Sequence, residues 1–477
     1  MFPSLFLLAT PLLPGALAQL SSTDVATVSS KLAQGATESW EIGTRAEALL
    51  ELNANQFSVF SSIPPPNSVP SNTTSALSPV FSIASNVVKA LKNTSAPAAL
   101  IPNDGAAGDP ASIGVAVLLA NWTGQNDGLD YARAAQNQLD YLLYEVPKTS
   151  DGAISHRVAQ VQLWSDNVYM VPPFLAYYGV LTGNTSLIDE AYNQINLYRN
   201  YLRDTSANNL WKHIVLGNDT SDGGNDPGHW STGNGWAAAG MLRVLATMKN
   251  SPYSGHYKSQ QKNLASWVKE IHTAMFSVID HTNIFMNYAD QNISSSGSFY
   301  DTSSTMLITG SVYRYALLWG DHTHLPNAEK CRQALFATSG SGSSSDGSAS
   351  SSKTSSSETS ASKASSSASS RISGSSFSSS ASASSAAASP SASAAGSITN
   401  FVHFTDDGWL TPVVNPDQFG VQGSDSAESE AFTLDFQAAY SEWVAAGSQG
   451  IDWGSRVGIS RIGAASAMIL VWTLLYA

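Results

Sequence analysis

The first candidate for chemistry is an acidic residue beside a tryptophan, within residues 164–175 (W-S-D-N-V-Y-M-V-P-P-F-L). Asp166 stands where a polar stretch passes into an apolar one, so we expect it at the N-terminus of a helix. Aromatic surroundings and partial burial raise the pKa of a carboxyl group, and a general acid needs such a pKa. An Asp at this position also caps helices, which stabilises them by about 1 kcal/mol. These residues alone leave both roles open.

The second candidate is the segment 229–237 (H-W-S-T-G-N-G-W-A), in which two tryptophans flank two glycines. We expect a glycine turn that lets the backbone approach a ligand closely. Aromatic faces such as Trp230 and Trp236, with a planar polar group such as Asn234, are typical of a sugar-binding cleft. The alternative is a glycine turn with tryptophans in the core.

Two histidines form the third candidate. His156 and Arg157 end the segment 151–157 (D-G-A-I-S-H-R), and His213 follows a tryptophan and a lysine. A lone histidine is more often structural than functional. The sequence has no histidine and carboxylate set with metal-ligand spacing, no glycine-rich phosphate loop and no serine nucleophile elbow. We therefore predict neither a metal nor a cofactor.

Four segments, in this order, resemble the signature segments of glycoside hydrolase families 88 and 105, the unsaturated uronyl hydrolases. Residues 164–175 resemble W-x-D-D-x-Y-M-x-x-P-F-L, and residues 230–237 resemble W-x-R-G-N-G-W-A. Residues 300–306 (Y-D-T-S-S-T-M) are similar to E-T-S-G-T-A-M, and residues 426–432 (S-A-E-S-E-A-F) to S-A-E-G-Q-A-F. The agreement in order and spacing covers about residues 151–447, whereas the N-terminal third matches only in its helical character.

The resemblance implies an all-α fold, an (α/α)6 barrel, and an oligosaccharide substrate that ends in a C4=C5 unsaturated uronic acid. Asp166 matches the catalytic aspartate of these families. It would protonate the enol-ether double bond and then act as a base while water adds, after which the sugar falls apart and the glycosidic bond breaks. This differs from the usual two-carboxylate scheme. The residues expected to bind substrate are His213, Trp164, Trp230, Asn234, Trp236 and His156.

Two positions depart from the family pattern. Thr232 stands where the family has an arginine, whose guanidinium fork would suit a substrate carboxylate. Asn167 replaces the second aspartate of the first segment and cannot ionise. We expect a changed substrate or reduced activity, with Arg157 or Lys212 as candidates to supply the missing positive charge.

Two other functions fit the same sequence. A family 76-like mannanase would share the barrel and the surface location, but that family has adjacent aspartates, whereas Asp166 is followed by Asn167. A non-catalytic carbohydrate-binding or cell-wall protein could have kept the barrel and lost the chemistry, which the changes at Thr232 and Asn167 favour.

Helical hairpins must position these residues. Helical spacing of apolar residues predicts one set of apolar helices, at residues 112–122, 168–181, 236–248, 304–319 and 431–446. Amphipathic partners are expected at residues 130–144, 186–202, 266–279 and 328–337. Stacking such pairs gives inner and outer helices, and six pairs in a closed ring fit the length. An open solenoid is the alternative. The single cysteine, Cys331, is expected to be a structural thiol.

Composition limits the partners. The 477 residues carry a formal net charge of −13, so we expect no nucleic-acid partner, because no basic face can replace the counterions around phosphates. An acidic substrate would need a local basic contact. Only 12% of residues are charged, against roughly 25% in ordinary globular domains, which suits a glycosylated extracellular protein.

Both ends read as targeting segments. Residues 1–18 resemble a secretory signal peptide, and residues 448–477 resemble a signal for a glycosylphosphatidylinositol anchor, although a final buried barrel helix is the alternative for the latter. Six glycosylation sequons agree with secretion: Asn72, Asn93, Asn121, Asn184, Asn218 and Asn292. We expect an extracellular, cell-surface protein whose only membrane attachment is this lipid anchor.

A low-complexity tract interrupts the chain. Residues 339–397 are almost all Ser and Ala, which predicts a disordered and O-glycosylated segment. Ordered-looking sequence resumes after it, so we interpret the tract as an insertion rather than a stalk. Residues 19–338 and 398–447 would then form one catalytic barrel, and such a long insertion is tolerable because loop-closure cost grows only logarithmically with length.

Overall fold

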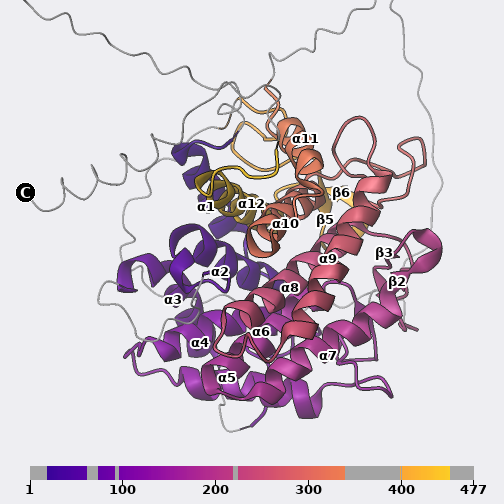
Figure 1. The fold of residues 1–477 in the computed structure, drawn as a ribbon. Coiled ribbons are helices and arrows are strands. Elements are labelled where there is room, and N and C mark those ends of the chain that lie inside the picture. The colour runs from indigo at the N-terminus through magenta and orange to yellow at the C-terminus, as the bar shows by residue number, and fades with distance from the viewer. Residues whose placement is uncertain are drawn as a thin grey trace, which may run out of the picture.

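The computed structural model describes residues 19–61, 73–91, 96–218, 224–338, 398 and 400–451. In this part of the chain, twelve α-helices alternate between an inner and an outer layer (Figure 1). The inner helices are α2 (Ser39–Asn53), α4 (Gly114–Trp122), α6 (Asn167–Thr182), α8 (Ser231–Asn250), α10 (Thr302–Trp319) and α12 (Ala427–Ala445). The outer helices are α1 (Ser22–Gly35), α3 (Thr73–Ala90), α5 (Tyr131–Asp140), α7 (Thr185–Leu202), α9 (Lys258–Val278) and α11 (Leu325–Leu335).

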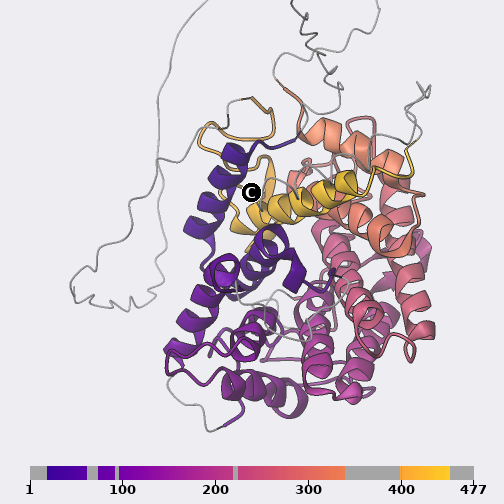
Figure 2. The same ribbon diagram turned by 60° about the vertical axis from the view of Figure 1, so that its left-hand side comes forward.

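The inner helices form a closed ring. Each packs against the next, a short 3-10 helix at Asp109–Ile113 fills the contact between α2 and α6, and α12 packs against α2. The sixth hairpin joins the two ends of the described chain, because α12 also packs against α1. Figures 1 and 2 show the yellow α12 beside the indigo N-terminal helices in both views. The structure therefore confirms the six-hairpin barrel, rather than an open solenoid.

Apolar composition decides which layer a helix occupies. In α6, every residue from Asn167 to Val180 is buried, so this helix can only lie inside. In α7, the buried residues recur at helical spacing, which is the pattern of an outer helix with one covered face. The nine helices predicted from spacing are all present, with most boundaries shifted by a few residues. Cys331 is buried in α11, and burial raises the pKa of its thiol to about 12, as a structural thiol requires.

One local prediction is wrong. Helix α8 begins at Ser231, so the two glycines after Trp230 lie in its first turns and do not form a separate turn. A Cβ atom at Gly233 would come within 2.3 Å of the Ser165 hydroxyl, and one at Gly235 within 2.8 Å of Leu307. These glycines therefore allow α8 to pack tightly against the segment before α6 and against α10.

Three short antiparallel strand pairs lie in the described loops that connect the helices. β1 (Leu163–Trp164) pairs with β4 (Ile214–Val215), and β2 (Arg203–Asp204) pairs with β3 (Leu210–Trp211). β5 (Val413–Asn415) and β6 (Gln418–Gly423) form a hairpin. Most of these strands are too short to show alternation of apolar and polar residues, which is why spacing did not predict them.

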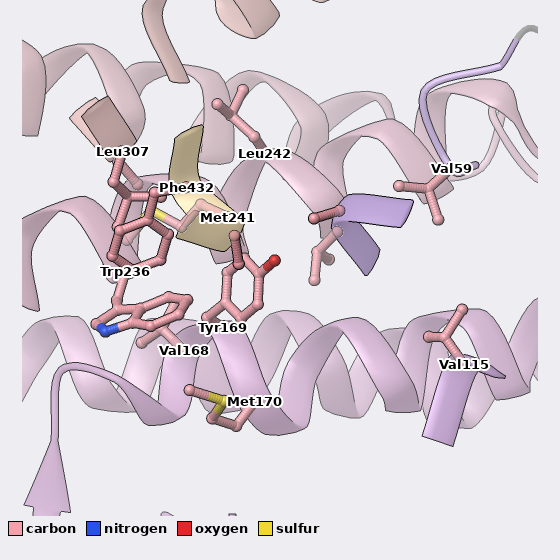
Figure 3. Packing of buried hydrophobic residues seen from close by; sticks show 14 of the residues in the cluster. Val59, Val115, Val168, Tyr169, Met170, Trp236, Met241, Leu242, Leu307 and Phe432 are labelled. Atoms are coloured by element: carbon pink, nitrogen blue, oxygen red, sulfur yellow. The ribbon is translucent and has the colours of Figure 1, made fainter. Parts of the chain in front are cut away.

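Aromatic packing ties the inner helices together beneath the barrel mouth. The rings of Tyr169 and Trp236 lie with centroids 4.5 Å apart, and Phe432 meets Trp236 edge-on at 4.7 Å (Figure 3). These three side chains come from α6, α8 and α12. Because protein interiors are close-packed, this contact fixes the relative position of the residues at the starts of the three helices.

Chain on both sides of the serine-rich tract belongs to one core. Thr338 pairs with Phe401 in an isolated bridge, and the Phe336 ring packs against those of Phe401 and Phe404. The tract, residues 339–397, lies outside the described residues, as do the expected signal peptide and nearly all of the expected anchor signal. No helix in the described ranges combines the length and apolarity needed to cross a bilayer.

Glu430 of α12 makes a pH dependence of stability predictable. Its side chain is buried, accepts one hydrogen bond from the Leu410 amide at 2.6 Å, and has a pKa raised by burial to about 8. Between pH 4.5 and 8 the Glu430 carboxyl is ionised in the unfolded chain but protonated in the folded chain, so the free energy of unfolding falls as the pH rises. The unfolding free energy of Glu430→Gln relative to that of the native chain should therefore increase from pH 5 to pH 8, by up to a few kcal/mol at about 1.4 kcal/mol per pKa unit.

Urea unfolding at the two pH values measures this effect. Glu145→Gln, at an exposed position, is the matched control and should show no growing difference. An equal free energy difference for Glu430→Gln at both pH values would contradict the prediction.

Candidate active site

A cleft opens where the inner helices begin. It contains about 900 Å³ not filled by protein atoms. Its lining includes Asp109, His156, Arg157, Trp164, Asp166, Trp230, Trp236, Phe419 and Glu428. Asp166 precedes α6, Trp230 precedes α8, and Glu428 is the second residue of α12. The polar and aromatic segments at the starts of the inner helices therefore meet at one mouth of the barrel.

Asp166 lies at the N-cap position of α6 but does not cap it, because its side chain makes no capping hydrogen bond. The residue is only 9% exposed, and the Ser165 hydroxyl donates to its Oδ2 at 3.0 Å. Burial raises the pKa of Asp166, against a smaller lowering by His213 and by hydrogen bonds. Of the two roles that the sequence left open, the geometry fits that of a buried acid.

His213 lies behind the cleft wall rather than in it. Its side chain is fully buried, with Nε2 3.6 Å from Asp166 Oδ2 and Nδ1 2.9 Å from Asp226 Oδ2. The ring contacts Trp164 and Trp230, with centroids 5.3 and 4.4 Å away. His213 therefore reaches the reacting region through Asp166, and direct contact with a sugar stays a prediction.

Aromatic rings line the cleft as expected, with one addition. Trp164 stacks on His156 at 4.8 Å, while Trp230 is held by a hydrogen bond from its indole N–H to Asn287. Phe419 of β6 closes the group, 6.0 Å from Trp164 and 6.1 Å from Trp230. Sequence reasoning missed Phe419. The Pro-Asp turn at 416–417 signals a hairpin, but no local pattern shows that this hairpin covers the cleft.

His156 is buried and pairs with another acid. Its Nε2 lies 3.7 Å from Asp109 Oδ1, and burial, helped by the charge of Arg157, lowers the pKa of the imidazole well below its usual range. Asn167 lies against it: a Cβ at Gly108 would come within 2.2 Å of Asn167 Oδ1 and 3.1 Å of His156 Nδ1. The glycine thus permits close contact around a histidine that stays neutral at neutral pH.

Two further carboxyl groups share the cleft with Asp166. Burial raises the pKa of both Asp109 and Glu428 well above the usual range, and the charge of Asp166 adds to this. Because like charges at one site disfavour one another, these carboxyl groups hold their protons to a higher pH than ordinary carboxyl groups do. Sequence reasoning missed both. Glu428 lies within residues 426–432, which resemble a family segment, and the Asp-Pro pair at 109–110 is a helix-start signal.

Like His213, three more residues that the sequence singled out do not line the cleft. Asn234 accepts a hydrogen bond from the Trp211 amide at 2.9 Å and donates to the carbonyls of Trp211 and Trp230, so its polar atoms hold the backbone. Thr232 is buried and donates to Asp301 at 3.1 Å. Lys212 forms an ion pair with Asp204 at 3.8 Å. Of the two basic residues considered as replacements, only Arg157 faces the cleft.

The described residues contain no group of three or more His, Cys, Asp or Glu side chains arranged to hold a metal ion. The chemistry available to these residues is proton transfer from buried carboxyl groups beside aromatic walls.

A closed ring of six helical hairpins is the architecture of the six-hairpin glycosidases. The model of Glycosyl Hydrolase Family 88 matches residues 81–368, more than half of the chain, and the chain belongs to this family. It is therefore a glycoside hydrolase, which removes the family 76 alternative and favours an enzyme over a non-catalytic wall protein.

Solved structures agree with the fold. A family 105 glycoside hydrolase from C. acetobutylicum has a TM-score of 0.55 at 14% identity, covering 87% of this chain and 99% of that one. A possible family 105 member from Klebsiella pneumoniae gives 0.58 at 11%, covering 92% and 96%. A family 88 protein from Bacteroides vulgatus gives 0.54 at 13%, covering 89% and 100%. At these identities the likeness shows the fold alone, and no curated protein matches the sequence.

Proposed function

We propose that this glycoside hydrolase removes a terminal C4=C5 unsaturated uronic acid from cell-wall or pectin-derived oligosaccharides, with Asp166 as the general acid. One observation carries the proposal: Asp166 is a buried carboxyl with a raised pKa, in an aromatic cleft, that caps no helix. A carboxyl group with a raised pKa keeps its proton to a higher pH and can deliver it to a weakly basic carbon.

The steps follow from enol-ether chemistry. Asp166 gives its proton to C4, and positive charge develops at C5 and the ring oxygen. Water adds at C5 and its proton passes to the Asp166 carboxylate, which restores the acid. The C5 hemiketal opens to a ketone, leaving C1 as a hemiacetal that releases the rest of the oligosaccharide as an alcohol. No second carboxylate is needed as a nucleophile, in contrast to a retaining glycosidase.

The test of this function uses the secreted chain and a panel of lyase-generated oligosaccharides. Unsaturated rhamnogalacturonan and glucuronan oligosaccharides are incubated separately, and loss of the double-bond absorbance is followed. Loss with either supports the reaction, and the preferred chain identifies the substrate class. Turnover of saturated oligosaccharides alone would overturn it.

Arg157 is the proposed partner of the uronate carboxylate. It is the basic side chain among the cleft-lining residues, and its guanidinium lies 5.6 Å from the Trp164 ring centroid. A charged hydrogen bond contributes about 1.5–3 kcal/mol, so Arg157→Met should raise KM by roughly 10- to 100-fold and change kcat less. Lys212→Met is the matched control, because Lys212 pairs with Asp204 outside the cleft. Initial rates over a range of substrate concentrations measure KM and kcat for both variants. A KM of Arg157→Met equal to that of the native enzyme would contradict the proposed role of Arg157 in binding the uronate.

We also propose that the protein is secreted, glycosylated and lipid-anchored at the cell surface. In support, all four sequon asparagines within the described ranges are exposed. They are Asn121, Asn184, Asn218 and Asn292. Asn72 and Asn93 lie outside those ranges. Expression of the full chain in a eukaryotic host, followed by peptide N-glycosidase and phosphatidylinositol-specific phospholipase C, tests this: a mass loss and release from cells are expected, and an unglycosylated intracellular protein would contradict it.

A further inference from the structure

The carboxylate of Asp226 is built into the wall behind Asp166. Its Oδ2 lies 2.9 Å from His213 Nδ1 and accepts from the Tyr288 hydroxyl at 2.7 Å, while its Oδ1 accepts from the Gly228 amide at 3.0 Å. These hydrogen bonds lower the pKa of Asp226 in spite of burial, which acts the other way. The group is therefore an ionised acceptor at neutral pH.

Backbone contacts hold the same arrangement. The His213 amide donates to the Gly228 carbonyl at 2.9 Å, and the Ser165 amide donates to the His213 carbonyl at 2.9 Å. Tyr288 is paired with Trp230 across an isolated bridge, and a Cβ at Gly228 would come within 2.5 Å of the Tyr288 ring. His213, Asp226 and Tyr288 thus come from three loops that are fixed to one another and to Asp166.

The remaining ring nitrogen of His213 has one neighbour of interest. Nε2 is buried, makes no hydrogen bond to any described residue, and lies 3.6 Å from Asp166 Oδ2. A carboxylate at Nδ1 fixes the proton on that nitrogen and leaves the other for exchange. The hydrogen bond to Asp226 therefore decides whether Nε2 of His213 faces Asp166 as a hydrogen-bond acceptor or as a donor.

We infer that Asp226, which Tyr288 helps to hold in place, is a positioning residue that keeps the Nδ1 proton on His213 and turns its Nε2 toward Asp166; the inference rests on the proposed role of Asp166. In the tautomer with Nδ1 protonated, Nε2 faces Asp166 as an acceptor only, to which the protonated carboxyl used in the first step can donate. The opposite tautomer would offer an N–H to Asp166 and favour its ionised form.

The variant that tests this is Asp226→Asn. An asparagine amide can donate to Nδ1, so the proton of a neutral His213 should move to Nε2. ¹⁵N NMR of protein labelled at its nine histidines reports the tautomer, with His213 assigned by loss of its signals in His213→Gln. We expect the Nδ1–H tautomer in the native chain and in Tyr288→Phe, and Nε2–H in Asp226→Asn. An unchanged tautomer in Asp226→Asn would overturn the inference, whether or not a substrate has been found.

Kinetics separate positioning from a merely structural role. Asp226→Asn should lower kcat/KM on the order of 100-fold in the native background. In the His213→Gln background, Asp226→Asn should lower kcat/KM less than about threefold, because the effects of substituting contacting residues that act as a unit are not additive. An equal loss in both backgrounds would mean that Asp226 only supports the loop, and would overturn the inference.

Asp290→Asn is the matched control. Asp290 lies 2.7 Å from Nδ1 of His229, the same kind of pair, but neither residue lines the cleft. This variant should change the His229 tautomer and leave kcat/KM near the native value. If the native chain cleaves no unsaturated uronide, the proposed function fails, and the tautomer of His213 still decides the inference by itself.

Discussion

Asp166→Asn is expected to lower the rate of double-bond loss by on the order of 10³-fold or more, within the range that general acid catalysis contributes. Asparagine has nearly the same shape but carries no transferable proton. The side chain is buried and receives one hydrogen bond, from the Ser165 hydroxyl, which an amide oxygen can also accept. The variant should therefore fold and bind substrate while losing the chemical step.

The pH dependence of the native enzyme's rate provides a second test of Asp166 as the general acid. Because burial raises the pKa of Asp166, the acid form persists above the range of an ordinary aspartate and is lost as the pH rises through the raised pKa. The rate should fall on that side of the profile. A rate that rises there instead would mean that the ionised carboxylate is the active form, and would contradict the general acid role.

A matched replacement separates this effect from a general change in cleft charge. Asp417 lies at the exposed tip of the β5–β6 hairpin and also lines the cleft, so Asp417→Asn removes the same charge at the rim. Its activity should remain readily measurable. If both variants lose activity equally, or if Asp166→Asn retains it, Asp166 is not the proton donor. Unfolding temperatures of the two variants exclude loss of the fold as the cause.

The barrel was predictable because its signals are local. Helix α6 is apolar throughout and α7 shows a single apolar stripe, so spacing assigns the first to the inside and the second to the outside. Asp166 and Trp230 were predictable for a related reason. A polar or aromatic residue at the start of an inner helix must lie at the barrel mouth, whichever helix it precedes.

What could not be predicted depends on contacts between distant segments. Phe419 reaches the cleft only because its hairpin folds back against Trp164 and Trp230. Asn234 looked like a sugar ligand, but the backbone of Trp211, in another loop, uses its amide. Asp109 stands in a short 3-10 helix with no helical spacing to mark it. In each case the partner lies far away in sequence, so no local pattern contains the information.

Arg243→Met is expected to destabilise the protein by about 3–5 kcal/mol, the usual cost of breaking a buried ion pair from one side. Arg243 is 4% exposed and donates to Glu47 at 2.7 Å and to Glu51 at 2.5 Å. Arg314 also binds Glu51, at 2.8 Å. These residues come from α2, α8 and α10, so the cluster ties together three inner helices near the barrel axis.

The cost arises from the carboxylate that is left behind. Arg243 supplies the hydrogen bond that neutralises Glu47, and burial already raises the pKa of Glu47 in spite of that partner. Without it, Glu47 must take up a proton or remain charged in an apolar interior. The destabilisation should therefore grow as the pH rises from 5 to 8, and Glu47→Gln combined with Arg243→Met should recover part of the loss.

Thermal and urea unfolding measure the effect, with Arg203→Met as the matched control. Arg203 pairs with Glu270 at 3.3 Å, and both side chains are partly exposed, so this surface ion pair contributes about 0–1 kcal/mol. Equal losses of unfolding free energy in the two variants would mean that the buried cluster does not stabilise the protein more than a surface ion pair does.

The Arg243 guanidinium lies 4.9 Å from the Tyr169 ring, and Tyr169 packs on Trp236, so loss of Arg243 should also displace the Trp236 side chain that lines the cleft. Arg243→Met should then raise KM as well as lower the unfolding temperature, which Arg203→Met should not do.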